Sequence, residues 1–340
     1  MDPSRVAAGA AALGLILAGR LKSIGPGGSL HQSPRPRGET TISRESRWRA
    51  SRARGSDETP SPSRVVPKSK RLIGSGASDL SPRLYEVGFR VYSESDEDGI
   101  LNYIFSLIGT VNRTLVDLGA SKLEGSNTAS LLINHGWTGL LIDGDEQRIK
   151  DLRELYAACL DTHHYPPKCV AAWITAENIN ELIRSARIEG EIDLLAIDLD
   201  GVDYWIWKAI DAVRPRVVAV EYQCILGPER CVTVPYRPDF KPIFEGPYAV
   251  YNSASLAAFV KLGRQKGYRL VGCQRYGYNA FFVRDDLARE DLPEVSPREC
   301  FNHPFPLWAM ETFLENNQAQ GVGRSVRELP PSQSTGPRSP

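Results

Sequence analysis

The 340-residue sequence lacks the short motifs that mark several large classes of enzyme. It has no GxSxG, no HExxH and no P-loop, which argues against a serine hydrolase, a zinc peptidase and a P-loop nucleotidase of the common kinds. It also has no GxGxxG, so a nicotinamide-dependent oxidoreductase ranks only as a minor alternative. Its chemistry must therefore be sought in the order of its strands and acidic residues.

Cysteine and histidine are too few and too scattered for a metal-binding finger. The six cysteines form no CxxC pair, and none of the five histidines lies at finger-like spacing. Cys169, Cys224 and Cys273 lie in or beside apolar runs, so we expect them to be core residues. This cysteine usage favours a reducing compartment and predicts a cytoplasmic protein.

Long hydrophobic runs are also missing. The apolar run Val6–Gly19 has 14 residues, fewer than the roughly 20 that a membrane helix needs. The segment at residues 1–23 is therefore a possible signal-peptide core or interfacial anchor, although it has no convincing small-x-small cleavage site. A membrane-tethered or exported protein is the alternative to a cytoplasmic one.

Composition divides the rest of the chain into a globular part and two polar ends. Residues 24–82 are rich in Gly, Pro, Ser and Arg and predict a disordered basic linker, and residues 316–340 predict a disordered tail. Residues 1–80 hold 14 basic and six acidic residues, a balance of +8, which leaves −8 for the others. The acidic domain predicted at residues 83–315 is therefore not expected to bind nucleic acid.

The stretch from Thr114 to Asp145 has the pattern of a strand, a glycine turn, a helix and a second strand. Its first apolar run ends at Asp117 and Gly119, as in a strand buried on both faces of a parallel sheet. The second strand ends on Asp143, about 20 residues or more beyond that turn, where a Rossmann-type site binds ribose hydroxyls. Alternatively, Asp143 only caps the helix that follows.

A second stretch, from Glu191 to Tyr222, repeats this pattern with more acidic residues. Its first strand is followed by Asp198, Asp200 and Asp203 around a glycine, and its second strand ends on Glu221. Because the carboxyl ends of parallel strands meet in one crevice, we expect the carboxylates of both stretches to converge there. The converging set is Asp117, Asp143, Asp198, Asp200 and Glu221.

Helices and strands alternate from Asp96 to Asp285. Helices are expected near 99–108, 127–134, 146–159, 177–187, 204–213 and 255–266, with Pro215 ending the fifth. Strands are expected near 114–118, 140–142, 170–173, 192–197, 217–220, 269–273 and 279–284, the last two as a hairpin. This order predicts an α/β fold, a doubly wound and mostly parallel sheet of the class I methyltransferase (Rossmann-like) type with an antiparallel edge hairpin.

Several motifs occur in the order known from one family. They are VDLGASKLEGSNT, GWTGLLIDGD, IDLLAIDLDGVDYWIWKAI, VVAVEY, SLAAFVKLGRQKGYRLVGC and NAFFVRDDL. From Tyr85 to Leu287 the chain thereby resembles the FkbM-type methyltransferases and their poorly characterised bacterial relatives. The resemblance implies S-adenosylmethionine as cofactor and transfer of its methyl group to a hydroxyl of a small molecule or glycan. It specifies neither the acceptor nor an oligomeric state.

The resemblance also implies roles for residues of the cofactor site. Asp117 and Gly119 would begin the cofactor loop, Ala120 and Ser121 would lie beside the amino-acid part of the cofactor, and Asp143 would bind the ribose. In this family a second glycine usually follows soon, whereas here the next is Gly125. A side chain in place of glycine hinders close approach to a ligand. Weak cofactor affinity, or a non-catalytic domain that binds a glycan or partner protein, is the alternative.

By the same resemblance, Asp198 would lie near the cofactor amine and the transferred methyl group. A hydroxyl acceptor needs a base. Asp198, Asp200 and Glu221 are the candidates, and Asp200 is favoured because the cofactor occupies Asp198. The main interpretation contains no metal, but Asp198 and Asp200 could instead hold a divalent ion, since hard cations prefer carboxylate oxygens.

The region after Glu221 is rich in loops and aromatic residues and is expected to form the acceptor pocket. Tyr222, Tyr236, Phe240 and Tyr251 could stack on a sugar or ring there, or serve as buried anchors of the loop.

Overall fold

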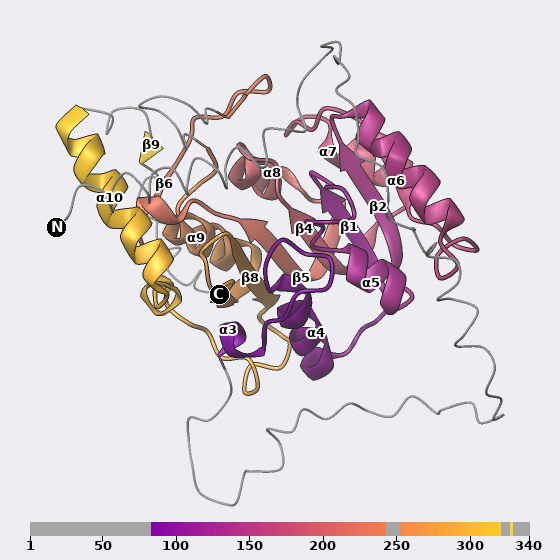
Figure 1. The fold of residues 1–340 in the computed structure, drawn as a ribbon, viewed down its shortest axis with the longest axis horizontal. Helices are drawn as coiled ribbons and strands as arrows, with labels where there is room; N and C mark the ends of the chain where they lie inside the picture. Colours follow the sequence, from indigo (N-terminus) through magenta and orange to yellow (C-terminus); the bar gives the residue numbers. More distant parts are fainter. Residues whose placement is uncertain (1–82, 243–251, 321–326, 329–340) are drawn as a thin grey trace, which may run out of the picture. The chain divides into compact units, whose positions relative to one another are not determined.

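A computed structural model of the chain describes residues 83–242, 252–320 and 327–328 (Figure 1). The apolar segment expected at residues 1–23 and the linker expected at 24–82 lie outside the described residues, as does Tyr251. Of the tail expected at 316–340, only 316–320 and 327–328 are described.

Seven strands form the central sheet in the order β3-β2-β1-β4-β5-β8-β7. The strands β1 to β5 pair with one another in parallel, whereas β8 is antiparallel to both β5 and β7. Their bounds are β1 Thr114–Leu118, β2 Thr138–Asp143, β3 Lys168–Ala171, β4 Gly190–Ile197, β5 Val213–Glu221, β7 Tyr268–Cys273 and β8 Asn279–Arg284. The predicted doubly wound, mostly parallel sheet with an antiparallel edge hairpin is confirmed.

Helices cover both faces of this sheet (Figure 1). One face packs on α4 (Glu97–Ile108), α5 (Ala129–Asn134) and α6 (Glu146–Ala158), and the other packs on α7 (Ile179–Ser185), α8 (Asp203–Ala209) and α9 (Leu256–Lys266). Neighbouring strand residues point to opposite faces, so Leu115 joins the core below α4 and Val116 the core below α8. This explains why the strands are continuous apolar runs without alternation.

Smaller elements surround the sheet. They are α3 (Leu84–Val87), η2 (Cys224–Leu226), β6 (Val232–Thr233), η4 (Pro297–Cys300), α10 (Pro304–Gln320) and β9 (Arg327–Glu328), which pairs with β6. Residue 315, where the sequence predicts the end of the domain, lies within the bounds of α10, and Trp308 and Met310 of this helix pack on the core. No helix among the described residues is long and apolar enough to cross a membrane.

Pro215 does not end a helix, contrary to the sequence prediction. The helix α8 already ends at Ala209, and Pro215 lies inside β5, opposite Ile192 of β4. The strand β8 pairs with β5 only from Val217 onward, so this part of β5 has a partner on one side alone. Proline is tolerated in a strand where a hydrogen-bonding partner is absent on one side.

The cysteines follow the prediction. All six are free, and Cys169, Cys224 and Cys273 are buried in the apolar core.

Candidate functional site

The carboxylates expected to converge do lie at one edge of the sheet. In the parallel register Asp117 pairs with Leu141 of β2 and with Ala196 of β4, so the tips of these three strands stand side by side. Glu221 ends β5, which continues the same parallel series beyond β4. This carboxyl edge is where open α/β sheets bind their ligands.

A tight turn after β1 forms the centre of this edge. Gly119 has a φ of +86°, and the amides of Gly119 and Ala120 both donate to the Ile142 carbonyl, at 2.9 and 3.0 Å. A Cβ on Gly119 would lie 1.8 Å from the carbonyl oxygen of Asp198. Only glycine therefore fits here, both because of the positive φ and because two backbone segments are in contact.

The loop that follows the turn is held at its far end. The Gly125 amide donates to the Tyr92 carbonyl at 2.7 Å, and Ser126 Oγ accepts from the Ala129 amide at 3.1 Å at the start of α5. Between these anchors Ser121 is half-buried and its hydroxyl donates to the carbonyl of Lys122 at 3.2 Å. Ala120 is buried, so its contribution to a ligand site would come from its backbone.

Asp117 is buried beside other acids. Thr128 Oγ1 donates to its carboxylate at 2.6 Å, and only 5% of the residue is exposed. Burial raises the pKa of Asp117 to about 7, and the nearby Asp198 and Asp143 add to this rise. A cationic group placed here would stabilise the charged form of Asp117.

Asp143 does not cap α6. The cap is Asp145, whose carboxylate accepts from the amides of Gln147 and Arg148, each at 3.0 Å. Asp143 instead accepts from the Asp145 amide at 2.7 Å and from Arg148 Nη1 at 2.9 Å. Burial raises the pKa of Asp143 while these donors oppose the rise. A carboxylate has about four acceptor positions, so further donors can still bind it.

Asp198, Asp200 and Glu221 come closest together. One carboxylate oxygen from each lies within 4.8 Å of the others. Glu221 is buried, and the two aspartates are half-buried. Asp203 plays a different part: it is fully buried and accepts from the amides of Leu199 and Gly201, at 2.8 and 2.9 Å. It therefore shapes the turn that carries Asp200, which has a φ of +53°.

Residues 232–240, here called the strap, follow η2 and cross the loops at the carboxyl edge. Trp205 Nε1 donates to the Val234 carbonyl at 2.8 Å, and the Tyr236 hydroxyl donates to Glu177 at 2.5 Å. Phe240 packs on Gly201, where a Cβ would lie 2.6 Å from its ring. Tyr222 and Phe240 are buried and Tyr236 is hydrogen-bonded to Glu177, so these three aromatic residues are loop anchors in the structure.

Sequence reasoning missed Trp173, which it assigned to the end of β3. The strand ends at Ala171, and Trp173 lies in the loop after it with 54% of its surface exposed. Its ring lies against Gly144, next to Asp143, and its Nε1 donates to the Pro238 carbonyl of the strap at 2.7 Å. A large exposed indole beside the candidate ligand residue Asp143 is a feature that sequence periodicity cannot indicate.

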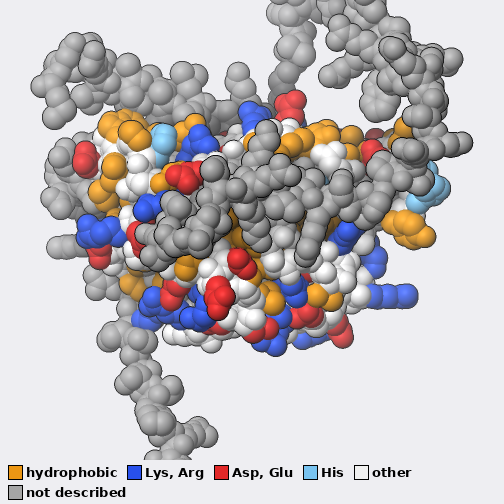
Figure 2. Space-filling view, turned by 90° about the horizontal axis from the view of Figure 1, so that it is seen from below, with side chains coloured by type: hydrophobic (Ala, Val, Ile, Leu, Met, Phe, Trp, Pro, Cys, Tyr) orange, Lys and Arg blue, Asp and Glu red, His pale blue; other side chains and the backbone are white. Residues whose placement is uncertain are grey.

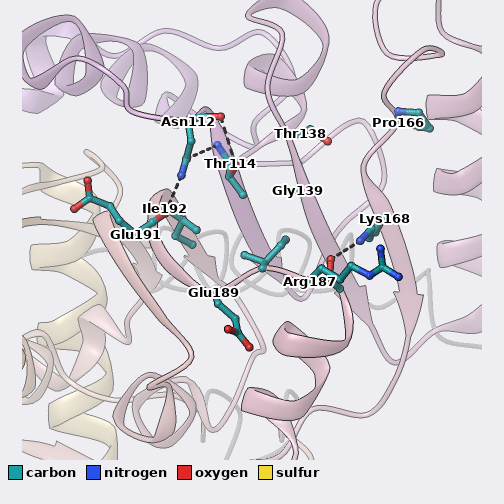
Figure 3. A pocket seen from close by; sticks show the side chains of 12 residues that line it. Asn112, Thr114, Thr138, Gly139, Pro166, Lys168, Arg187, Glu189, Glu191 and Ile192 are labelled. Atoms are coloured by element: carbon teal, nitrogen blue, oxygen red, sulfur yellow. Dashed lines mark hydrogen bonds between the residues drawn. The ribbon is translucent and has the colours of Figure 1, made fainter.

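A cavity lies elsewhere, at the amino ends of the strands. Its volume is about 360 Å³, and its lining includes Thr114, Thr138 and Lys168, each the first residue of a strand or next to it (Figure 3). Figure 3 also shows Arg187 and Glu189 among the residues that line it. None of the carboxylates at the carboxyl edge lines this cavity. Because ligands of open α/β sheets bind at the carboxyl ends, we assign the candidate site there.

Comparison with known proteins gives distant structural neighbours only. No protein-family model matches the chain, and no curated protein matches its sequence. Among solved structures, magnesium protoporphyrin IX methyltransferase from Synechocystis with bound S-adenosylmethionine is 12% identical, covering 55% of this chain and 77% of that one, with a TM-score of 0.33.

Two further solved structures are similar to the same degree. The N-terminal domain of EvdMO1, in the presence of S-adenosylhomocysteine and D-fucose, is 13% identical over 58% of this chain and 88% of that one, with a TM-score of 0.35. Mycolic acid cyclopropane synthase CmaA1 with S-adenosylhomocysteine is 10% identical over 71% and 82%, with a TM-score of 0.32. These values assign neither a family nor a function to the chain.

Proposed function

We propose that the chain is an S-adenosylmethionine-dependent methyltransferase that methylates a hydroxyl group of a small molecule or glycan. One observation carries the proposal: Asp117, Asp143 and Asp198 meet around the Gly119 turn at the carboxyl edge of a seven-stranded, mostly parallel sheet. The motif series that resembles the FkbM-type methyltransferases supports it.

The donor set suits this cofactor. S-adenosylmethionine carries an ammonium group and a sulfonium group, and the carboxylates of Asp117 and Asp198 would favour these positive charges. Asp143 would accept hydrogen bonds from the ribose hydroxyls. Trp173 would give the adenine ring a flat apolar surface beside Asp143, since aromatic side chains stack on nucleobases. Gly119, Ala120 and Ser121 would border the amino-acid part of the cofactor.

The bound cofactor would supply an electrophilic methyl group. The protein then has two tasks: to align the acceptor oxygen with the methyl carbon, and to remove the hydroxyl proton. Asp200 would accept this proton, with Glu221 beside it, while Asp198 holds the cofactor. The products would be a methyl ether, a protonated carboxyl group and neutral S-adenosylhomocysteine.

The class of methyl acceptor is inferred from the surface charge, and its point of entry from the position of the strap. On the face shown in Figure 2, basic and acidic side chains are interspersed among the coloured residues. This supports a small-molecule or glycan acceptor rather than nucleic acid. The acceptor would enter beside Glu221, where the strap borders the site.

We place the protein in the cytoplasm, with attachment to a membrane or export through residues 1–23 as the alternative.

A non-catalytic binding domain is the second candidate. It is favoured by Ser121, Lys122 and Leu123, which occupy the place where the resembling family has a second glycine. The Asp143–Arg148 ion pair at 2.9 Å also supports it, because Arg148 occupies one carboxylate oxygen in the absence of ligand.

Calorimetry with S-adenosylmethionine, S-adenosylhomocysteine and NAD tests the proposal. Both adenosyl ligands should bind and NAD should not. Asp143→Ala should weaken S-adenosylhomocysteine binding by about tenfold to a hundredfold, because hydrogen bonds to charged groups contribute roughly 1.5 to 3 kcal/mol each. Its unfolding free energy should fall as well, since the substitution removes the acceptor of the Asp145 amide and of the Arg148 guanidinium, so affinity is measured at a temperature at which the variant is fully folded.

Asp145→Ala is the matched control two residues away. Loss of the α6 cap should lower the unfolding free energy by about 1 kcal/mol and leave ligand affinity unchanged. If Asp145→Ala and Asp143→Ala weaken binding equally, Asp143 has no special role in the site. A parent protein that binds neither adenosyl ligand would contradict the cofactor assignment itself.

A further inference from the structure

Three carboxylates from two chain segments surround one point at the carboxyl edge. Asp198 follows β4, Asp200 lies in the turn after it, and Glu221 ends β5. One oxygen of each lies within 4.8 Å of the other two. Carboxylate oxygens at such spacing are the ligands that Mg²⁺ and Ca²⁺ prefer, although acidic groups also gather without an ion.

A second observation comes from β8. Asn279 pairs directly with Glu221 in the antiparallel register, so both side chains leave the same face of the sheet as neighbours. Asn279 is only 4% exposed, and its amide nitrogen donates to Glu97 Oε1 at 3.2 Å. Its amide oxygen is buried, and the described residues provide no hydrogen-bond partner for it.

The contact with Glu97 also fixes which way the amide is turned. A carboxylate accepts hydrogen bonds, so the nitrogen of Asn279 must face Glu97. The oxygen is then on the other branch of the amide, and its residue is the direct cross-strand neighbour of Glu221. A buried acceptor oxygen in this place is suited to a cation or to a water molecule bound to one.

We infer that Asp198, Asp200 and Glu221 bind one divalent hard cation, with the Asn279 amide oxygen as a fourth ligand, directly or through water. Mg²⁺ fits better than Ca²⁺, because Mg²⁺ binds few protein groups and keeps several waters, whereas Ca²⁺ takes six to eight oxygen ligands. Two carboxylate charges would be balanced by the ion. The third would remain for the cationic cofactor.

The use of this ion rests on the proposed function, but its binding does not. An ion beside the transferred methyl group would orient the acceptor hydroxyl and lower its pKa, as a Lewis acid does. Asp200 would then act as a ligand and not as the base. The binding site itself is defined by the four side chains, whatever reaction the protein catalyses.

Binding of Mn²⁺ tests the inference without any substrate. The metal-free full-length protein is titrated with Mn²⁺ while free Mn²⁺ is followed by electron paramagnetic resonance. We expect one strong site per chain from which Mg²⁺ displaces Mn²⁺. Asp200→Asn should weaken it at least tenfold and Asn279→Leu several-fold. The matched control Asp161→Asn, which changes an exposed aspartate in the loop before β3, should bind as the parent does.

Thermal unfolding provides the second readout. Mg²⁺ should raise the melting temperature of the parent and of Asp161→Asn but not that of Asp200→Asn, because a ligand stabilises only the state that binds it. Absence of a strong Mn²⁺ site, or equal affinity in all three variants, would overturn the inference. Binding that is lost in Asp200→Asn but retained in full by Asn279→Leu would exclude Asn279 as a ligand, both directly and through water, and would overturn that part of the inference.

The outcomes for the ion and for the cofactor are separable. Mn²⁺ binding by a protein that binds no S-adenosylhomocysteine would keep the ion site and refute the proposed function. S-adenosylhomocysteine binding by a protein without an Mn²⁺ site would refute the ion site and keep the proposed function.

Discussion

The two edges of the sheet use buried acids in opposite ways. At the amino edge, Asp193 is fully buried, accepts hydrogen bonds from the backbone amides of Val111, Asn112 and Arg113, and pairs with Arg216 at 3.2 Å. At the carboxyl edge, the Asp117 carboxylate accepts one hydrogen bond, from the Thr128 hydroxyl at 2.6 Å. Burial raises the pKa of Asp117, and nearby acids add to this rise.

This difference separates a structural acid from one that is suited to a ligand. The donors around Asp193 satisfy its charge within the protein, so it joins the segment before β1 to β4. The acids around Asp117 repel one another, and a bound cation would relieve this repulsion. The contrast between the two edges can be tested by mutation at each of them.

The largest effect is expected at the amino edge. Asp193→Ala removes the acceptor of three backbone amides and leaves the nearly buried Arg216 without its closest carboxylate, so the unfolding free energy should fall by about 3 to 5 kcal/mol. Urea denaturation measures this. Asp211→Ala, which breaks an exposed ion pair with Arg184, is the control and should change stability little. Equal losses in the two variants would show that burial and donor number do not matter here.

A pH effect of intermediate size is expected at the carboxyl edge. Burial raises the pKa of Asp117 from 3.8 to about 7, so between these values the folded protein holds a proton that the unfolded chain has lost. Asp117 should therefore contribute a fall in stability as the pH rises from about 4 to 7, by at most about 1.4 kcal/mol per pH unit. The contribution is complete below pH 4 and is lost through pH 7.

Asp117→Asn tests this sign. The variant keeps an acceptor for Thr128 but cannot ionise, so its unfolding free energy should fall less steeply over the same pH range. Denaturation at several pH values gives the two slopes. Parallel curves for the variant and the parent would mean that Asp117 ionises at the same pH in the folded and unfolded states.

The smallest effect is expected from Trp173. Trp173→Ala should weaken S-adenosylhomocysteine binding by about tenfold, near the lower limit of the roughly 1 to 3 kcal/mol found for aromatic stacking on a base. Its stability should change little, because more than half of the side chain is exposed. Tyr165→Ala is the control: this residue is 82% exposed and lies before β3, at the opposite edge. Unchanged affinity in Trp173→Ala would remove this residue from the adenine site.

The sequence predicted most strands because buried parallel strands have a simple pattern. The strands at Thr114–Leu118 and Asn279–Arg284 were predicted with their observed bounds, since both are apolar runs bounded by turn residues. The prediction that Pro215 ends a helix was wrong. Proline is tolerated at this position of β5 because β8 does not pair with this part of the strand. That fact depends on pairing between distant segments.

The position of the candidate site could also be predicted, but not its contacts. Topology alone brings strand tips together, which is why Asp198 and Glu221 could be named from the sequence. Side-chain orientations within one turn of helix decide two of these contacts. They determine that Arg148 binds Asp143, and that Asp145 rather than Asp143 caps α6. Contacts over 182 residues, such as Asn279 with Glu97, leave no periodic signal in the sequence.

The outer side of β7 has a consequence for self-association. Strand β7 is at the end of the sheet, but the Val295 amide already donates to its Leu270 carbonyl. The buried Arg269 also binds the carbonyls of Leu292, Arg284 and Leu287, which holds the chain segment after β8 against this edge. A second copy could not extend the sheet here without displacing that segment. Extension of this sheet would have to use β3, a strand of only four residues, which protects the fold against edge-to-edge aggregation.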